Sequence, residues 1–188
     1  NKEIIQFTTN AISNEFPIDD SKSIGLFLKT AGDLERVGDH AVNIAERAEK
    51  LYSEDEHFSD EAMREIKIMN DLTRNILEEL NVLNRDELHN IVEKVDVIED
   101  SIDITTHEFS LNQLRRLRDK KCTPEHSALY TETLIDFERI GDHGLNIAVA
   151  FDEIKDDLTE EESEMFSRTG TSHVIAISGL HTGIICVL

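Results

Sequence analysis

The chain contains one thirteen-residue pattern twice, as DLERVGDHAVNIA at 33–45 and as DFERIGDHGLNIA at 136–148. Nine of the thirteen positions are identical, and the other four exchange one apolar or small residue for another. The same offset of 103 residues lays Asp20 and Ser21 on Thr123 and Pro124, so that two expected helix starts also coincide. The repeat therefore predicts two copies of one structural unit.

Apolar residues recur every three or four positions along most of the chain, which is the period of an amphipathic helix. No glycine occurs between Asp39 and Ile140. We predict five helices, at 2–14, 20–52, 60–84, 86–119 and 124–155. The residues expected to start the last four are Asp20 or Ser21, Ser59, Asp86, and Thr123 followed by Pro124. Because the turns between them are short, the fold class is all-α, an antiparallel helical bundle.

The composition limits the partners of the chain. Its 40 acidic and 19 basic residues give a formal charge of −21, which repels nucleic acid and anionic membrane surfaces. Cations are therefore the expected partners. The two cysteines have no CxxC spacing, so they indicate neither a disulfide framework nor a zinc knuckle, and a reducing cytosol fits them.

The repeated pattern places carboxylates at helical spacing. Residues four apart lie on the same face of a helix, so each copy presents a neighbouring pair of carboxylates. The pairs are Glu35 with Asp39, and Glu138 with Asp142; VIEDSID at 97–103 supplies a third, Glu99 with Asp103. Clustered carboxylates raise one another's pKa unless a cation neutralises them. Such oxygen-rich sets suit Mg²⁺, Mn²⁺ or iron.

The surroundings of the carboxylates can also be read from the helical period. Leu34, Val37, Ala41, Ile44 and Ala48 form the expected buried stripe. Glu35, Asp39 and Asn43 fall on the opposite, solvent-accessible side. His40 and His143 are candidate nitrogen ligands or second-shell donors. Arg36 and Arg139 are expected to pair with Asp33 and Asp136, or with the edge of the carboxylate cluster.

A solvated acidic helix face is the alternative interpretation. It is the favoured one for Glu99 and Asp103 taken alone. Solvation does not require the same Arg, Gly, Asp, His and Asn twice in one register, so the repeated pattern favours a function. Gly38 and Gly141 cost helix propensity, and close helix approach is the expected compensation.

With these residues the sequence resembles the PhoU family, whose signature has the form ERIGDHAxNIAE, here at 35–46 and 138–148. Residues 1–157 are most similar to the PhoU-like domain of bacterial sodium/phosphate cotransporters. The resemblance implies two three-helix repeats with truncated ends, at 1–84 and 85–157. It also implies multinuclear clusters of a divalent metal or iron (Fe, Zn, Mn or Mg).

Carried over by position, the ligands fall into two clusters. Glu35 and Asp39 belong to the first. Glu99, Asp103, Glu138 and Asp142 belong to the second. The residues expected in the second shell are His40, Asn43, His143 and Asn146. The first copy lacks the carboxylate pair that would correspond to Glu99 and Asp103, so the second site is expected to hold metal better.

The last part of the chain differs from the rest. The twenty residues after Arg168 carry no charge, and no sixth amphipathic helix is evident. The stretch 165–188 resembles the ISGLH segment of ComEC-type competence proteins. Residues 158–188 are therefore treated as a linker and apolar tail, with a disordered or artefactual tail as the alternative.

The resemblance implies a regulatory role in phosphate transport, with no catalytic residue and no enzyme activity. A membrane phosphate transporter, in the same polypeptide or separate, is the expected partner, together with a second copy of the chain; nucleic acid is not. The expected location is cytoplasmic, at the inner face of the cell membrane. A metal-dependent hydrolase and a purely structural helical adaptor are the alternatives.

Overall fold

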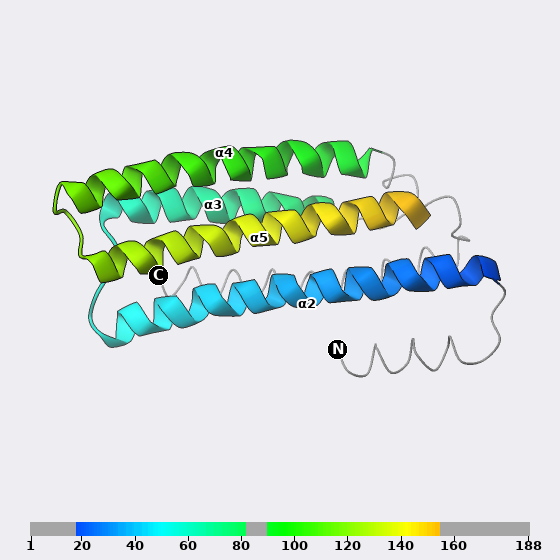
Figure 1. The fold of residues 1–188 in the computed structure, drawn as a ribbon, viewed down its shortest axis with the longest axis horizontal. Coiled ribbons are helices and arrows are strands. Elements are labelled where there is room, and N and C mark those ends of the chain that lie inside the picture. The colour runs from blue at the N-terminus through cyan, green and yellow to red at the C-terminus, as the bar shows by residue number, and fades with distance from the viewer. Residues whose placement is uncertain (1–17, 82–89, 155–188) are drawn as a thin grey trace.

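A computed structural model describes residues 18–81 and 90–154. The helices in these ranges are α2 (Ile18–Ser53), α3 (Asp60–Glu79), α4 (Ile91–Arg118) and α5 (Pro124–Ile154). No strand occurs within the same ranges. The predicted all-α antiparallel bundle is confirmed, as Figure 1 shows.

The predicted helix bounds hold best where a side chain caps the helix. The Ser59 hydroxyl accepts a hydrogen bond from the amide of Ala62, and the Thr123 hydroxyl accepts one from that of His126. Pro124 occupies the first position of α5, where its missing N–H costs nothing.

Other expected bounds were wrong. Helix α2 begins at Ile18, so neither Asp20 nor Ser21 is its cap. Helix α3 ends at Glu79, not at 84. Helix α4 begins at 91, not at 86, directly after Asn90, whose φ of 68° is a left-handed conformation that asparagine tolerates. The predicted cap Asp86 and the predicted helix 2–14 lie outside the described residues.

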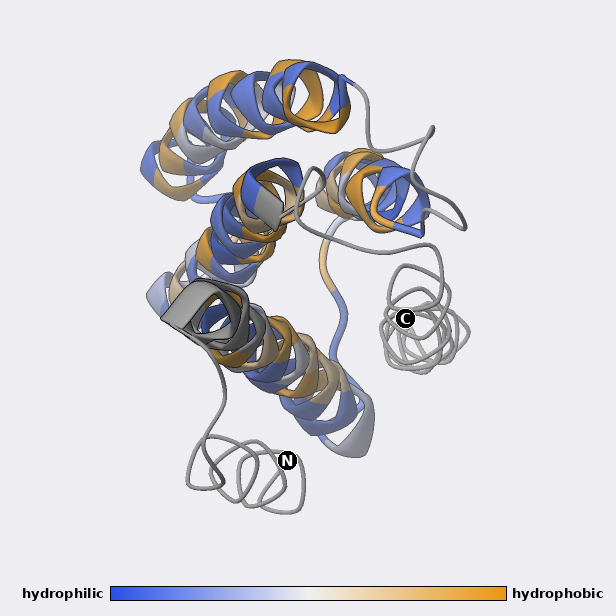
Figure 2. Ribbon diagram, turned by 90° about the vertical axis from the view of Figure 1, so that its right-hand side faces the viewer, coloured by the Kyte–Doolittle hydropathy of each residue, from blue (hydrophilic) through white to orange (hydrophobic). Residues whose placement is uncertain are grey.

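Helix α5 is the central element of the bundle. It packs against α2, α3 and α4, whereas α2 packs mainly against α5. Cross-helix contacts show that α2 and α4 run antiparallel to α5 and that α3 runs parallel to it. Apolar and polar residues lie on different sides of each helix (Figure 2). Helix α3 packs against α4 and α5. The division of the chain into two repeats, at 1–84 and 85–157, stays a prediction.

A buried polar network joins α3, α4 and α5 at one end of the bundle. Arg116 of α4 donates to Glu65 of α3 at 2.6 Å, and the Tyr130 hydroxyl of α5 donates to the same carboxylate. Asn112 donates to its other oxygen at 2.9 Å. Burial by itself would raise the pKa of Glu65, but these hydrogen bonds outweigh it and hold the pKa below the ordinary value. The charged pair therefore fixes the register of three helices at once.

Close packing explains one difference between the two copies of the pattern. A Cβ added at Gly144 would overlap Cγ2 of Ile76, which is fully buried on α3. The corresponding residue of the first copy is Ala41, on α2. Glycine in the second copy thus lets α3 approach α5. None of the described helices is long and apolar enough to span a lipid bilayer.

We predict that Gly144→Ala lowers the free energy of unfolding by about 1–3 kcal/mol, because the added methyl group overlaps a buried, β-branched side chain. The matched control is Gly38→Ala, where no described atom lies within 4 Å of the position that a Cβ would take. It should raise stability by up to about 1 kcal/mol through helix propensity. Urea unfolding followed by circular dichroism measures both, and equal stabilisation by the two changes would contradict the close approach.

Candidate metal centre

The repeated pattern lies on α2 and α5 with the orientation that the helical period predicts. Val37, Ala41, Ile44 and Ala48 are buried. On the opposite side of α2, Glu35, Asp39 and Asn43 are exposed. The motif carboxylates of the first copy are therefore solvent-accessible, as expected.

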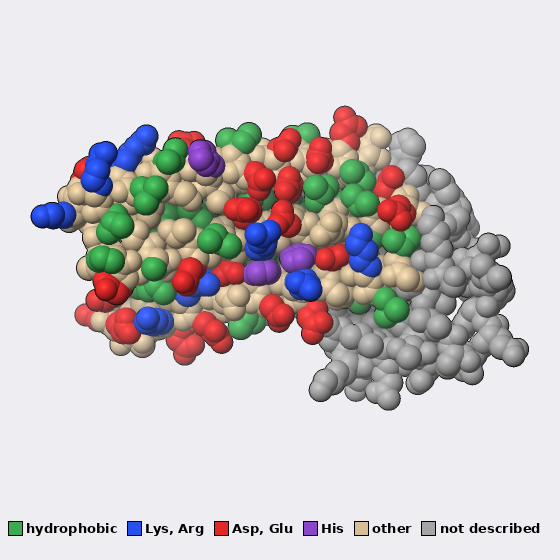
Figure 3. Space-filling model, viewed as in Figure 1, with side chains coloured by type: hydrophobic (Ala, Val, Ile, Leu, Met, Phe, Trp, Pro, Cys, Tyr) green, Lys and Arg blue, Asp and Glu red, His purple; other side chains and the backbone are tan. Residues whose placement is uncertain are grey.

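Three carboxylates from two helices meet near the middle of the bundle. Glu99 and Asp103 on α4 and Asp142 on α5 each offer an oxygen within 4.8 Å of the others. Glu99 and Asp142 are partly buried, and Asp103 is exposed. Acidic side chains gather at this level over α4 and α5 in Figure 3. The element at 99–103 and the second copy of the pattern thus form one acidic cluster.

Gly141 makes this approach of α4 to α5 close. A Cβ added there would lie 3.2 Å from Cδ1 of Ile102 and 3.7 Å from Cγ of Glu99. The expected role of Gly141 in helix approach is confirmed. At Gly38 no atom of the described residues lies within 4 Å of the position that a Cβ would take, so the same expectation for this glycine stays a prediction.

The electrostatics of the cluster favour a bound cation. Burial, then the charges of Asp103 and Asp142, raise the pKa of Glu99 to about 7. Burial and the charge of Asp103 also raise the pKa of Glu138, although the Arg139 guanidinium opposes them. Glu99 and Glu138 thus cost free energy to ionise in this partly buried, acidic surrounding. A di- or trivalent cation would remove that cost.

The donor set fits a hard or borderline metal ion. Glu99, Asp103 and Asp142 supply oxygen ligands only, with Glu138 one turn before Asp142 on the same helix. Oxygen-only sets suit Mg²⁺, Mn²⁺ or iron, and three side chains leave coordination positions for water or a second ion. The set does not select one metal.

Glu35 and Asp39 have a different environment. Both are exposed on α2, and across residues 18–81 and 90–154 no third carboxylate, histidine or cysteine joins them in a metal-sized group. Their role as metal ligands stays a prediction. That the second copy holds metal better than the first also stays a prediction.

The two motif histidines join the copies to each other. His40 Nδ1 of α2 lies 2.6 Å from Asp136 Oδ1 of α5, and His143 Nδ1 of α5 lies 2.9 Å from Asp33 Oδ1 of α2. The offset between the copies converts one pair into the other. The two rings stack with centroids 5.8 Å apart. We call the set of four residues, His40, Asp136, His143 and Asp33, the histidine–aspartate clasp.

Sequence reasoning missed the partners in the clasp. Asp33 and Asp136 were expected to pair with Arg36 and Arg139. Instead they bind the histidines, and Arg139 pairs with Asp142 at 2.8 Å, the expected alternative at the cluster edge. The sequence did contain a sign that both aspartates matter, since Asp33 and Asp136 are equivalent and identical positions of the repeat. A second-shell role of the histidines toward a metal stays a prediction.

The clasp is not symmetric in its surroundings. Arg47 binds Asp136 and also Glu132, at 3.2 Å, and Asn43 donates to Asp136 at 3.3 Å. The second copy has Ala150 where the first has Arg47. The Oδ2 atom of Asp33 is accordingly buried and has no hydrogen-bond partner among the described residues. Asn146, the counterpart of Asn43, is exposed, and its second-shell role stays a prediction.

Comparisons with known proteins agree with these features. The profile of the PhoU domain matches residues 1–48, which contain the first copy of the pattern. The phosphate-specific transport system accessory protein PhoU homolog 1 of Thermotoga maritima is 28% identical over 148 residues, or 78% of this chain. The chain spans 63% of the length of that relative. These similarities support a relationship to the PhoU family.

Two further comparisons concern the tail and the fold. The profile of the competence protein family, described as Competence protein, matches residues 154–188, so the expected resemblance of the tail is confirmed. No solved structure matches the chain significantly. The link to sodium/phosphate cotransporters stays a prediction.

We predict that Arg47→Met lowers the free energy of unfolding by about 2–4 kcal/mol, because it leaves the buried Asp136 carboxylate without its guanidinium. Arg74→Met is the matched control. Arg74 pairs with Asp71 on the exposed side of α3, so its loss should change stability by less than about 0.5 kcal/mol. Similar effects of both changes on thermal unfolding would refute the structural role of Arg47.

Proposed function

We propose that this chain is a metal-binding regulatory domain of the PhoU type that modulates phosphate transport. The observation that carries the proposal is the meeting of Glu99, Asp103 and Asp142 across α4 and α5. The oxygens of these three carboxylates, one from the second copy of the pattern and two from the acidic element at 99–103, are close enough together to bind one ion. The similarity to an accessory protein named for phosphate-specific transport supports the regulatory part.

The metal would be held by four residues of the second half. Glu99 and Asp103 would approach it from α4, and Glu138 and Asp142 from α5. A bound cation supplies positive charge that offsets the repulsion between these carboxylates. In doing so it would tie α4 to α5 at mid-length. More than one metal ion, of iron, Zn, Mn or Mg, is the form we propose for the cluster.

Glu35 and Asp39 would bind metal more weakly in this chain. They lie on α2 without a further ligand among the described residues. The two copies would then respond to different metal concentrations.

The partners follow from the same proposal. The domain would act at the cytoplasmic face of the membrane on a phosphate transporter, either in the same polypeptide or separate from it. It would do so as a regulator and not as an enzyme, and as a pair of identical chains. The acidic surface disfavours nucleic acid as a partner.

We predict that Asp142→Asn removes most of the bound metal, because Asp142 is the only member of the three-carboxylate group that α5 contributes. Asp39→Asn should remove much less. Asp96→Asn, an exposed aspartate of α4 outside the group, is the control for the change in charge. Elemental analysis after purification at neutral pH and after metal titration measures the content.

Several results would count against the proposal. Wild-type protein that retains no metal, and that unfolds identically with and without it, would remove the cluster. Phosphatase turnover that depends on added metal and disappears in Asp142→Asn would favour the hydrolase alternative. Equal metal content in Asp142→Asn and Asp96→Asn would exclude the ligand set that we propose.

The raised pKa of Glu99 gives a second prediction. A carboxyl group whose pKa rises on folding contributes most stability below its unfolded pKa of about 4.5, and loses that contribution as the pH rises through about 7. At pH 8 the metal-free Glu99→Gln protein should therefore be more stable than wild type by about 1–2 kcal/mol. At pH 5 the two should differ little.

Metal binding should have the opposite pH dependence. Because the metal requires ionised Glu99, wild-type affinity should rise between pH 5 and pH 8, and Glu99→Gln should lower it throughout. Thermal unfolding with and without metal at both pH values measures the two effects. If metal-free Glu99→Gln is less stable than wild type at pH 8, the ionised Glu99 carboxylate stabilises the fold, and the prediction is wrong.

A further inference from the structure

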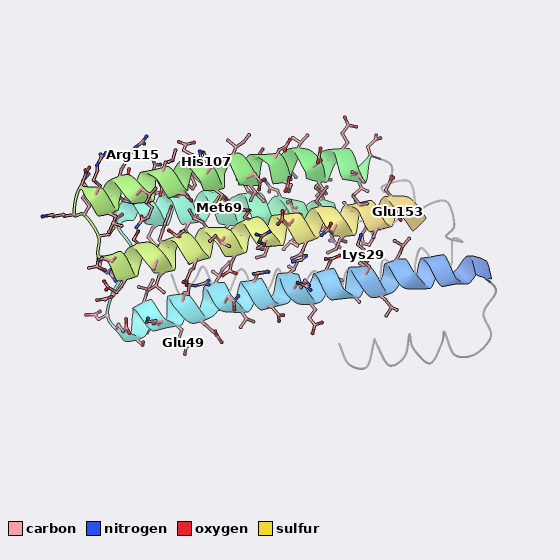
Figure 4. The ribbon with its side chains drawn as sticks, viewed as in Figure 1. Lys29, Glu49, Met69, His107, Arg115 and Glu153 are labelled. Carbon is pink, nitrogen blue, oxygen red and sulfur yellow. The ribbon has the colours of Figure 1, made fainter. Side chains whose placement is uncertain are left out.

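This acidic chain has one strongly basic stretch, RRLRDKK at 115–121. It contains five of the 19 basic residues of the chain and one of its 40 acidic residues. The stretch covers the end of α4 and the turn into α5, and basic side chains gather at this end of the bundle in Figure 3. Arg115 is labelled there in Figure 4. A local charge opposite to that of the whole chain indicates a surface with a partner of its own.

Four of the five basic residues are available to a partner. The exception is Arg116, which binds Glu65 in the buried network and lies 3.8 Å from Glu61. The others are all exposed, and among the described residues only Arg118 of these four has an ion-pair partner, Asp119 at 3.3 Å. They are Arg115, Arg118, Lys120 and Lys121.

The backbone of the turn holds the two lysines in place. The amide of Lys121 donates to the carbonyl of Arg116 at 2.9 Å, and the amide of Lys120 donates to that of Leu117 at 3.0 Å. Lys120 has a φ of 56°, the left-handed conformation that ends a helix in this way. The positive charges therefore continue beyond the helix in a defined turn.

An exposed leucine lies beside these charges. Leu114 is 60% exposed. At 3.6 residues per turn, Leu114, Arg115 and Arg118 fall within about 100° of one another, and Arg116 lies about 100–160° away from them. We define the basic tip as Leu114, Arg115, Arg118, Lys120 and Lys121. Basic and apolar side chains on one side of a helix are typical of a surface that binds at a membrane interface.

The helix dipole offers a purely structural explanation of the arginines, because cations stabilise the C-terminal end of a helix. The other helices do without it: the last turns of α3 and α5 contain no basic residue, and that of α2 contains only Lys50. The dipole also leaves the exposure of Leu114 unexplained.

Acidic groups near the basic tip leave it an excess of positive charge. Asp119 and Glu125 are close to it in the chain, against four exposed basic residues. Glu108 lies seven residues, or about 10 Å along the helix, before Arg115. At physiological ionic strength charges more than about 8 Å apart are largely screened from each other. The acidic connection at 54–56 follows α2, which lies on the opposite side of α5 from α4 in Figures 1 and 2.

We propose that the basic tip binds the anionic phospholipids of a membrane surface. The inference rests on the proposed function for its location at the cytoplasmic face. There the loops of membrane proteins carry an excess of lysine and arginine, and the lipids around them are anionic. The loops match the acidic sides of this domain, whereas the lipids match the basic tip. Lipid is therefore a better fit for the tip than the protein partner is.

This contact leaves the metal centre clear of the lipid. Asp103 lies twelve residues, or about 18 Å along α4, before Arg115. The domain would stand with the basic tip on the membrane and the acidic cluster above it. The total charge of the chain still repels an anionic surface in any orientation that lays the acidic sides on it. Lipid binding thus fixes the orientation of the domain as well as its place.

Vesicle co-sedimentation of the full chain tests the proposal. Wild type should bind vesicles of equal parts phosphatidylglycerol and phosphatidylcholine at least about tenfold more tightly than vesicles of phosphatidylcholine alone, and less tightly as salt is added. Replacing all four basic residues of the tip by glutamine should remove most of this binding. The variant carries Arg115→Gln, Arg118→Gln, Lys120→Gln and Lys121→Gln.

The matched control removes the same amount of charge elsewhere. It replaces four other exposed basic residues of the described helices by glutamine and should bind nearly as well as wild type, since no residue of the basic tip is changed. These are Lys29, Lys67, Arg74 and Lys94. Circular dichroism checks that both variants remain folded.

A fluorescent reporter locates the contact. The chain has no tryptophan, so Leu114→Trp gives a single signal, which should shift to shorter wavelength with the anionic vesicles and be quenched by brominated lipid. Val97→Trp is the control, because Val97 is 62% exposed on the same helix. It lies about 26 Å from position 114 and should show neither effect.

Specific outcomes would overturn the inference. One is wild-type protein that does not bind the anionic vesicles at low salt. Another is a glutamine variant of the tip that binds them as wild type does, with no shift at Trp in position 114. Wild type that binds poly-glutamate but not vesicles would show that the tip takes an acidic protein segment instead.

Two other readouts keep the result specific. The stretch after Arg168 carries no charge, so binding through it would not distinguish the two kinds of vesicle. Metal content should be the same in the tip variant and in wild type. Loss of metal from Asp142→Asn with unchanged vesicle binding supports the basic tip as a separate site, and failure of the proposed metal centre is read from metal content alone.

Discussion

The structure depends on the histidine–aspartate clasp between α2 and α5. These helices come from the two copies of the pattern, and the two clasp pairs are exchanged by the offset between the copies. A contact of this kind fixes the rotation of both helices about their axes. Each histidine directly follows a motif aspartate, Asp39 or Asp142. Once the histidines are held between α2 and α5, the aspartates point away from that contact: Asp39 is exposed, and Asp142 lies toward Glu99 and Asp103 of α4.

The acidic cluster and the packing beneath it oppose each other. The carboxylates of Glu99, Asp103 and Asp142 repel one another when ionised. Burial, together with this repulsion, raises the pKa of Glu99. Ile102 seated against Gly141 nevertheless brings α4 and α5 close together at this level. At the end of the bundle, the buried ion pair of Arg116 on α4 and Glu65 on α3 also accepts a hydrogen bond from Tyr130 of α5, so it holds these three helices in register. Apolar and polar contacts thus hold the carboxylates close together, and a bound cation would offset the repulsion between them.

The sequence predicted local features well and long-range pairing poorly. Helical period and caps located α5 almost to the residue, because Thr123 and Pro124 are strong local signals. The resemblance to the PhoU family implied which carboxylates would meet, and three of those four, Glu99, Asp103 and Asp142, lie together. The partners of Asp33, Asp136 and Glu65 depended on how helices pack against each other. Several arginines and histidines were equally suitable by sequence, and only the fold decided among them.

The unpaired oxygen of Asp33 makes the two ends of the α2–α5 contact unequal. At one end Asp136 binds a histidine, an amide and a guanidinium. At the other end, within residues 18–81 and 90–154, Asp33 binds His143 alone, and Ala150 stands in place of the arginine. The two copies are alike in sequence, but the contacts of their aspartates with the opposite helix differ in number. A partner that separates these helices meets the least resistance at the Asp33 end.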